Sequence, residues 1–182
     1  MKRLCFLFLI VSAFVACRNK NASNVSVSAQ TFVVDANKHT VDSLIMNNND
    51  TAFVVKNKVS DKDMGTKRAV YEIHVMFSNK KWPVLHFKNA IGADLYVAGD
   101  LDGDDEPELL LRPEWFNNCW SSINLFSLKE GGWRLVKFGG MYFCADQYPL
   151  PARIEKQSEK YYLITDTIIN EKFVVDRKEI EF

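Results

Sequence analysis

Hydrophobic and polar residues alternate along much of this chain, and the clearest example covers residues 70–77. Four large side chains would share one face of an extended segment there: Tyr71, Ile73, Val75 and Phe77. The intervening residues, Glu72, His74 and Met76, would share the other face. Alternation of this kind predicts a β-strand with one buried face and one face toward water.

Short runs rich in β-branched and aromatic residues recur between turn residues elsewhere in the chain. They read TFVVD, TAFVVK, ADLYVAG, ELLLR, SSINLFSL, WRLVKF, KYYLIT and KFVVD, and each is typical of a strand. Hairpin turns are indicated at residues 77–82 and 128–133, where Gly131 and Gly132 tolerate positive φ. The pattern predicts an all-β fold, a single small antiparallel sandwich or barrel-like domain with at most one short helix among residues 36–50.

The composition indicates how many domains the chain forms and which kinds of partner it can bind. A chain of 182 residues with 47% hydrophobic residues suits one well-buried domain. Basic and acidic residues number 23 each, so there is no excess of positive charge of the kind that nucleic-acid binding requires. We therefore expect no nucleic-acid partner.

The N-terminus has the pattern of an export signal. Lys2 and Arg3 precede an apolar run at residues 4–16, which is shorter than the roughly 20 residues needed to span a bilayer. The segment FVAC at residues 14–17 resembles the lipobox of bacterial lipoproteins, although that family usually has Leu where this chain has Phe14. The alternative is an ordinary secretory signal that is cleaved near residue 16.

The lipobox resemblance implies that residues 1–16 are removed and that Cys17 is lipidated. The lipid bilayer would then be a partner, and the protein would be anchored at the bacterial cell envelope, on the periplasmic or surface side of the outer membrane. Residues 17–30 are rich in Asn and Ser and predict a flexible tether. The all-β domain would cover residues 31–182.

Two cysteines, Cys119 and Cys144, remain within the predicted domain. In an exported protein such a pair predicts a disulfide. Two buried free thiols or a metal pair are the alternatives.

Six of the nine residues at positions 100–108 are acidic, and three leucines follow at once. Carboxylates stand at positions one, three, five and nine of this loop, and the backbone carbonyl of Glu106 stands at position seven: Asp100, Asp102, Asp104, Glu106 and Glu108. A hard cation such as Ca²⁺ is bound by six to eight oxygens of this kind. Gly103 permits a sharp bend, and Pro107 stiffens the exit into the next strand.

The sequence DLDGDDEPELLL at residues 100–111 resembles the calcium loop of FG-GAP and integrin-type β-propeller repeats. The resemblance implies a structural Ca²⁺ and a hairpin like that of one propeller blade. At the sixth position, where the family prefers Gly, this chain has Asp105, which would have to adopt a left-handed conformation. The loop occurs once, so a complete propeller of such repeats is excluded, and a solvated acidic turn without a cation is the alternative.

Three aromatic residues follow the acidic loop: Trp115, Phe116 and Trp120. Rings held outward beside a disulfide would suit a binding surface for an unknown envelope protein or glycan. The alternative is that the rings cover the disulfide as part of the core.

No catalytic motif of the common hydrolase or metalloenzyme families occurs, so we expect a non-enzymatic binding module. The enzymatic alternative is a hydrolase that uses Glu114 with Asp146. The chain also resembles small exported lipoproteins of Bacteroidetes-type bacteria and lysozyme-inhibitor-like immunity proteins of the periplasm, which implies inhibition of lysozyme or a peptidoglycan hydrolase as a further alternative. Asp-Ser/Thr triplets at residues 42–44, 50–52 and 166–168 resemble an O-glycosylation signal.

Overall fold

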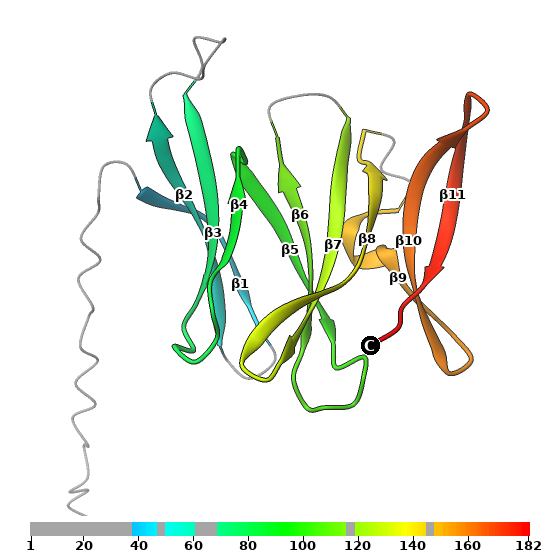
Figure 1. Cartoon of the computed structure of the whole chain (residues 1–182), viewed down its shortest axis with the longest axis horizontal. Helices are drawn as coiled ribbons and strands as arrows, with labels where there is room; N and C mark the ends of the chain where they lie inside the picture. Colours follow the sequence, from blue (N-terminus) through cyan, green and yellow to red (C-terminus); the bar gives the residue numbers. More distant parts are fainter. Residues whose placement is uncertain (1–37, 47–49, 61–68, 116–118, 145–147) are drawn as a thin grey trace, which may run out of the picture. The chain divides into compact units, whose positions relative to one another are not determined.

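The computed structural model describes residues 38–46, 50–60, 69–115, 119–144 and 148–182 (Figure 1). Over these residues the fold is all-β, as predicted, with three antiparallel sheets and one short 3-10 helix. Among them there is no helix with the length and apolarity that a membrane crossing requires. The predicted signal segment 1–16, the lipidation residue Cys17 and the tether 17–30 lie outside the described residues.

The first sheet is an antiparallel meander in the order β1-β2-β3-β4. Its strands are β1 (Lys38–Ile45), β2 (Thr51–Ser60), β3 (Val70–Phe77) and β4 (Leu85–Lys88). The alternation predicted for β3 is confirmed, because Ile73 and Val75 are buried whereas Met76 is exposed. The short helix expected among residues 36–50 is wrong, because β1 occupies this region. Strand β1 lies at the sheet edge and pairs with β2, so non-local pairing determines its conformation.

The second sheet is also a meander, in the order β5-β6-β7-β8. Its strands are β5 (Gly92–Gly99), β6 (Glu108–Glu114), β7 (Trp120–Lys129) and β8 (Gly132–Tyr142). Leu109 and Leu111 of β6 pack into a core shared with the first sheet. Leu110 faces the opposite way, into a second core shared with the third sheet. The leucine run is unbroken because this sheet is covered on both faces.

The third sheet has the order β11-β10-β9. It contains β9 (Ile154–Gln157), β10 (Lys160–Ile169) and β11 (Lys172–Glu179), and the 3-10 helix η1 (Leu150–Arg153) precedes β9. A buried ion pair links the helix to β10: Arg153 donates to both carboxylate oxygens of Asp166, at 2.9 and 2.8 Å. The same carboxylate accepts the backbone N–H of Tyr142 at 2.7 Å, so it also joins β8 to β10.

The hairpin predicted at residues 128–133 is present between β7 and β8, but its turn is displaced by one residue. Positive φ occurs at Glu130 (51°) and Gly131 (76°), whereas Gly132 already begins β8. The turn between β10 and β11 likewise has two residues with positive φ, Asn170 (50°) and Glu171 (62°). Neither glutamate has the conformational freedom that glycine would have there.

The predicted disulfide is confirmed between Cys119 and Cys144, whose Cα atoms lie 5.1 Å apart. The two residues flank the open end of the β7–β8 hairpin. Beside the bridge, the backbone N–H of Phe143 donates to the carbonyl of Cys119 at 2.9 Å. A structural disulfide indicates a protein of an extracytoplasmic, oxidising compartment.

Candidate calcium loop and aromatic pocket

The acidic loop between β5 and β6 is folded around the side chain of Asp100. The carboxylate of Asp100 accepts backbone N–H groups from Gly103 at 2.7 Å, Asp104 at 3.1 Å and Asp105 at 3.1 Å. Positive φ occurs at Gly99 (88°), the last residue of β5, and at the loop residues Gly103 (81°) and Asp105 (69°). The sixth loop position therefore has the left-handed conformation expected for it, with Asp in place of Gly.

Three of the five predicted ligand residues converge. One oxygen from each of Asp100, Asp102 and Glu108 lies within 4.8 Å of the other two, so this cluster could hold a metal ion. Glu108 is fully buried, and the Asp102 side chain is only 7% exposed. Asp102 Oδ1 and Glu108 Oε1 are buried without a hydrogen-bond partner among the described residues. Buried carboxylate oxygens normally have a partner, so these two oxygens are available as metal ligands.

The Asp104 side chain has other partners than the three converging carboxylates. The Asp104 carboxylate pairs with Lys129 at 2.6 Å and accepts the backbone N–H of Glu106 at 3.0 Å. The Asp104 carboxylate is not part of the cluster of three converging carboxylates, and the ligand predicted at Glu106 is its backbone carbonyl rather than its side chain.

Lys129, at the end of β7, is the part of this site that the sequence did not reveal. Its ammonium also pairs with Asp102, at 2.6 Å. Hydrogen bonding from Lys129 lowers the pKa of Asp104, and hydrogen bonds to Asp102 and Asp104 raise the pKa of Lys129. The antiparallel pairing of β6 with β7 brings this lysine to the loop, and a correct strand register is the only signal that could have identified it.

Burial raises the pKa of Glu108, and the nearby carboxylates of Asp102 and Asp104 raise it further. A hydrogen bond from the backbone N–H of Leu101, at 2.6 Å, opposes this effect in part. Ionising Glu108 therefore costs more here than in water, and a nearby divalent cation would offset that cost.

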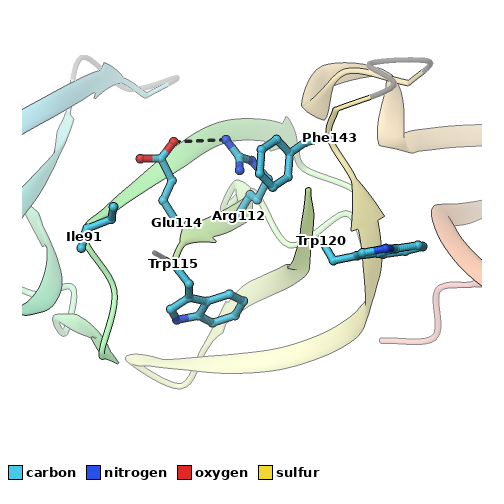
Figure 2. Close-up of a pocket in the computed structure, with 6 residues that line it drawn as sticks. All are labelled: Ile91, Arg112, Glu114, Trp115, Trp120 and Phe143. Carbon is cyan, nitrogen blue, oxygen red and sulfur yellow. Dashed lines mark hydrogen bonds and ion pairs between the residues drawn. The ribbon is translucent and has the colours of Figure 1, made fainter. Parts of the chain in front are cut away.

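A pocket of about 220 Å³ lies beyond the other end of β6 (Figure 2). Its lining contains two of the three aromatic residues predicted as a binding surface and combines apolar with charged side chains: Ile91, Arg112, Glu114, Trp115, Trp120 and Phe143. The structure thus brings Trp115 and Trp120 to one hollow, whereas Phe116 lies outside the described residues.

Arg112 forms the polar inner wall of this pocket. Its guanidinium forms an ion pair with Asp94, donates to Glu114 at 3.3 Å and lies 4.6 Å from the ring centre of Phe143 (Figure 2). Arg112 therefore has its ionic partners at this end of β6 and not in the acidic loop. Because Asp94 and Glu114 both pair with this guanidinium, the three groups together carry a formal charge of −1 and do not favour an anion.

The two indole rings differ in their surroundings. Trp115 is 38% exposed at the pocket mouth. Trp120 is half-buried and packs against Tyr142 and Phe173, with ring centres 5.2 and 6.2 Å apart. Trp115 therefore agrees with the outward-facing prediction, and Trp120 also takes part in an aromatic cluster between the second and third sheets.

The carboxylate pair of the hydrolase alternative is described only in part. Glu114 accepts a hydrogen bond from Arg112, whereas Asp146 lies outside the described residues.

We compared the chain with protein-family models, curated protein sequences and solved structures, and none of them matches it.

Proposed function

We propose that the mature chain is a lipid-anchored, non-enzymatic binding module of the bacterial envelope, with a structural Ca²⁺ in the acidic loop and a neutral glycan as its ligand. The pocket between Trp115 and Trp120 is the observation that carries this proposal. The disulfide supports an extracytoplasmic location, and the lipobox-like segment at residues 14–17 supports the anchor.

Calcium is the cation that the loop chemistry favours. The three converging side chains offer only carboxylate oxygens, and hard cations prefer such ligands, whereas zinc sites usually include nitrogen or sulfur. A cation between Asp102 and Glu108 would supply the partner that their buried oxygens lack. Its role is structural, because the loop joins two strands of the central sheet and lies away from the pocket.

The pocket favours a neutral, hydroxyl-rich ligand over an anion or a large apolar molecule. A volume of about 220 Å³ is below the range of about 300–1,000 Å³ typical of drug-sized ligands, so it suits one sugar ring of a longer chain. Indole rings offer flat apolar faces to a sugar, and the Glu114 carboxylate, which is 43% exposed, can accept hydrogen bonds from its hydroxyl groups.

Isothermal titration calorimetry with cello-, xylo-, manno- and chito-oligosaccharides tests the glycan ligand. Trp115→Ala should weaken binding of the preferred oligosaccharide by at least about tenfold, since loss of an aromatic hot-spot contact costs about 2 kcal/mol. Phe138→Ala is the matched control, because Phe138 is a 61% exposed aromatic residue outside the pocket lining. Equal effects of the two variants, or no binding of any of the four sugars, would contradict the proposal.

A further inference from the structure

A second group of metal-ligating side chains lies on the first sheet, where nothing in the proposed function places a site. His74 of β3 and His86 of β4 are directly opposite each other in the strand register. Glu72 precedes His74 by two residues and therefore has its side chain on the same face of β3. Strand pairing thus presents two imidazoles and one carboxylate on one face of the sheet.

The three side chains are close enough to share one ion. Glu72 Oε2 lies 2.8 Å from His86 Nε2 and 3.6 Å from His74 Nε2, and one ligand atom from each residue lies within 4.8 Å of the other two. A tetrahedral ion with bonds of about 2.0–2.1 Å holds its ligand atoms about 3.3 Å apart. The two measured separations lie on either side of that value, so small side-chain rotations would complete the site.

His74 Nε2 is the atom that most needs a partner. It is buried and makes no hydrogen bond within the described part of the chain. The residue opposite His74 on β2 is Val55, whose side chain has no polar atom to offer. The rings of His74 and His86 meet edge to face with centres 4.6 Å apart, so neither ring is turned away from the other.

Glu72 is suited to be the oxygen ligand, because its carboxylate is already close to both imidazoles. Its Oε2 is hydrogen-bonded to His86 Nε2 at 2.8 Å and lies 3.6 Å from His74 Nε2. The side chains remain partly open to water, with exposed fractions of 42% for His86 and 29% for His74. An ion bound here would keep at least one coordination position for water or for a group from another molecule.

We propose that Glu72, His74 and His86 form a binding site for a divalent transition-metal ion of the Zn²⁺ class. Imidazole nitrogen with one carboxylate suits Zn²⁺, Cu²⁺, Ni²⁺ and Co²⁺ and does not suit Ca²⁺, which takes oxygen ligands. The protein would then hold two chemically different metal sites, one on the first sheet and one at the edge of the second.

The test titrates the full chain, produced without a histidine tag, with Zn²⁺ in competition with a chromophoric chelator. Excess CaCl₂ keeps the acidic loop occupied. Wild type should bind one Zn²⁺ at this site, and His86→Gln or His74→Gln should each weaken that binding by at least about tenfold. Co²⁺ should give the visible absorption bands of a tetrahedral ion in wild type and lose them in both histidine variants.

Asp100→Asn is the reciprocal control, because it alters the acidic loop and leaves the imidazoles in place. It should leave the Zn²⁺ affinity unchanged, and thermal melts verify that every variant is folded. The proposal is overturned if His86→Gln binds Zn²⁺ as wild type does, or if Asp100→Asn is the variant that loses it. In the first case the contact between His86 and Glu72 would be a surface hydrogen bond without a metal.

Discussion

Replacing Glu108 by Gln should have opposite effects with and without calcium. Gln has nearly the shape of Glu and keeps an oxygen that can accept the backbone N–H of Leu101. The change removes one negative charge from a buried position next to other carboxylates. The substitution should therefore relieve the repulsion between carboxylates when no cation is bound, and it should weaken the stabilisation by a cation when calcium is present.

The magnitude follows from the distances. Like charges within 4.8 Å of each other, as in the cluster of Asp100, Asp102 and Glu108, repel by about 3 kcal/mol at an effective dielectric constant of about 20. The ion pair between Lys129 and Asp102 offsets part of this repulsion. We therefore expect Glu108→Gln to raise the free energy of unfolding by about 1–2 kcal/mol without calcium, which corresponds to about 3–6 °C in the melting temperature.

With calcium, wild type should become the more stable of the two proteins, whereas Glu108→Gln is the more stable without it. At a calcium concentration of about 100 times its dissociation constant, wild type should gain about 2.7 kcal/mol, or about 5–10 °C. Glu108→Gln should gain less than about 2 °C, because it lacks one charged ligand. Thermal melts followed by circular dichroism, in EGTA and in CaCl₂, measure both differences.

Glu106→Gln is the matched control. It removes the same charge from the same loop but leaves the predicted ligand at that position, the backbone carbonyl, unchanged. It should therefore respond to calcium as wild type does. If the wild-type melting temperature is the same in EGTA and in CaCl₂, or if the two variants respond alike, the reasoning about this loop is refuted.

The pH dependence of the stability of wild type and of Glu108→Gln is a second readout. Because the pKa of Glu108 in the folded protein is raised above its usual value of 4.5, ionised Glu108 destabilises the metal-free fold above that raised pKa. Protonation removes this cost, so in metal-free buffer the stability gap between wild type and Glu108→Gln should close as the pH falls toward about 4.5. Calcium stabilisation of wild type should weaken over the same range, because the ion competes with the proton.

Two further predictions concern the fold. Asp166→Asn should lower the free energy of unfolding by about 3–5 kcal/mol in urea titrations, because it leaves the buried Arg153 charge without its partner; Arg153→Met in the same chain should recover part of the loss. Glu171→Gly should raise the free energy of unfolding by about 0.5–1 kcal/mol, because Glu171 has a φ of 62° in the β10–β11 turn.

Each of these two predictions has its own contradicting result. If Asp166→Asn lowers the free energy of unfolding by less than about 1 kcal/mol, the Arg153–Asp166 pair stabilises the fold no more than a surface salt bridge such as Lys160–Glu179 does. A destabilised Glu171→Gly variant would show that the glutamate side chain contributes more to the turn than its backbone strain costs.

The sequence was sufficient to predict features that depend on residues close together along the chain. Alternation along β3 predicted its buried face, and the resemblance to the calcium loop of propeller repeats implied the left-handed conformation that Asp105 adopts. The unbroken leucine run of β6 indicated burial but not its cause, which is that two different sheets cover the two faces of the strand.

The features that the sequence did not predict depend on strand register. Lys129 reaches the acidic loop only because β7 pairs with β6, and His74 meets His86 only because β4 pairs with β3. Strands β1, β4 and β9 have weak patterns of their own and are defined by their neighbours. The Arg153–Asp166 pair joins two elements whose packing no local pattern encodes.

The most direct test of the central claim, that the Trp115 pocket binds a neutral glycan, is a titration followed by NMR of the indole N–H signals. The chain has four tryptophans, and two of them serve as internal controls: Trp82 is buried, and the Trp133 indole donates to the carbonyl of Pro83 at 2.8 Å. The account predicts that saturating oligosaccharide shifts the signals of Trp115 and Trp120 and leaves those of Trp82 and Trp133 in place. Shifts confined to Trp82 and Trp133, or no shift at all, would contradict it.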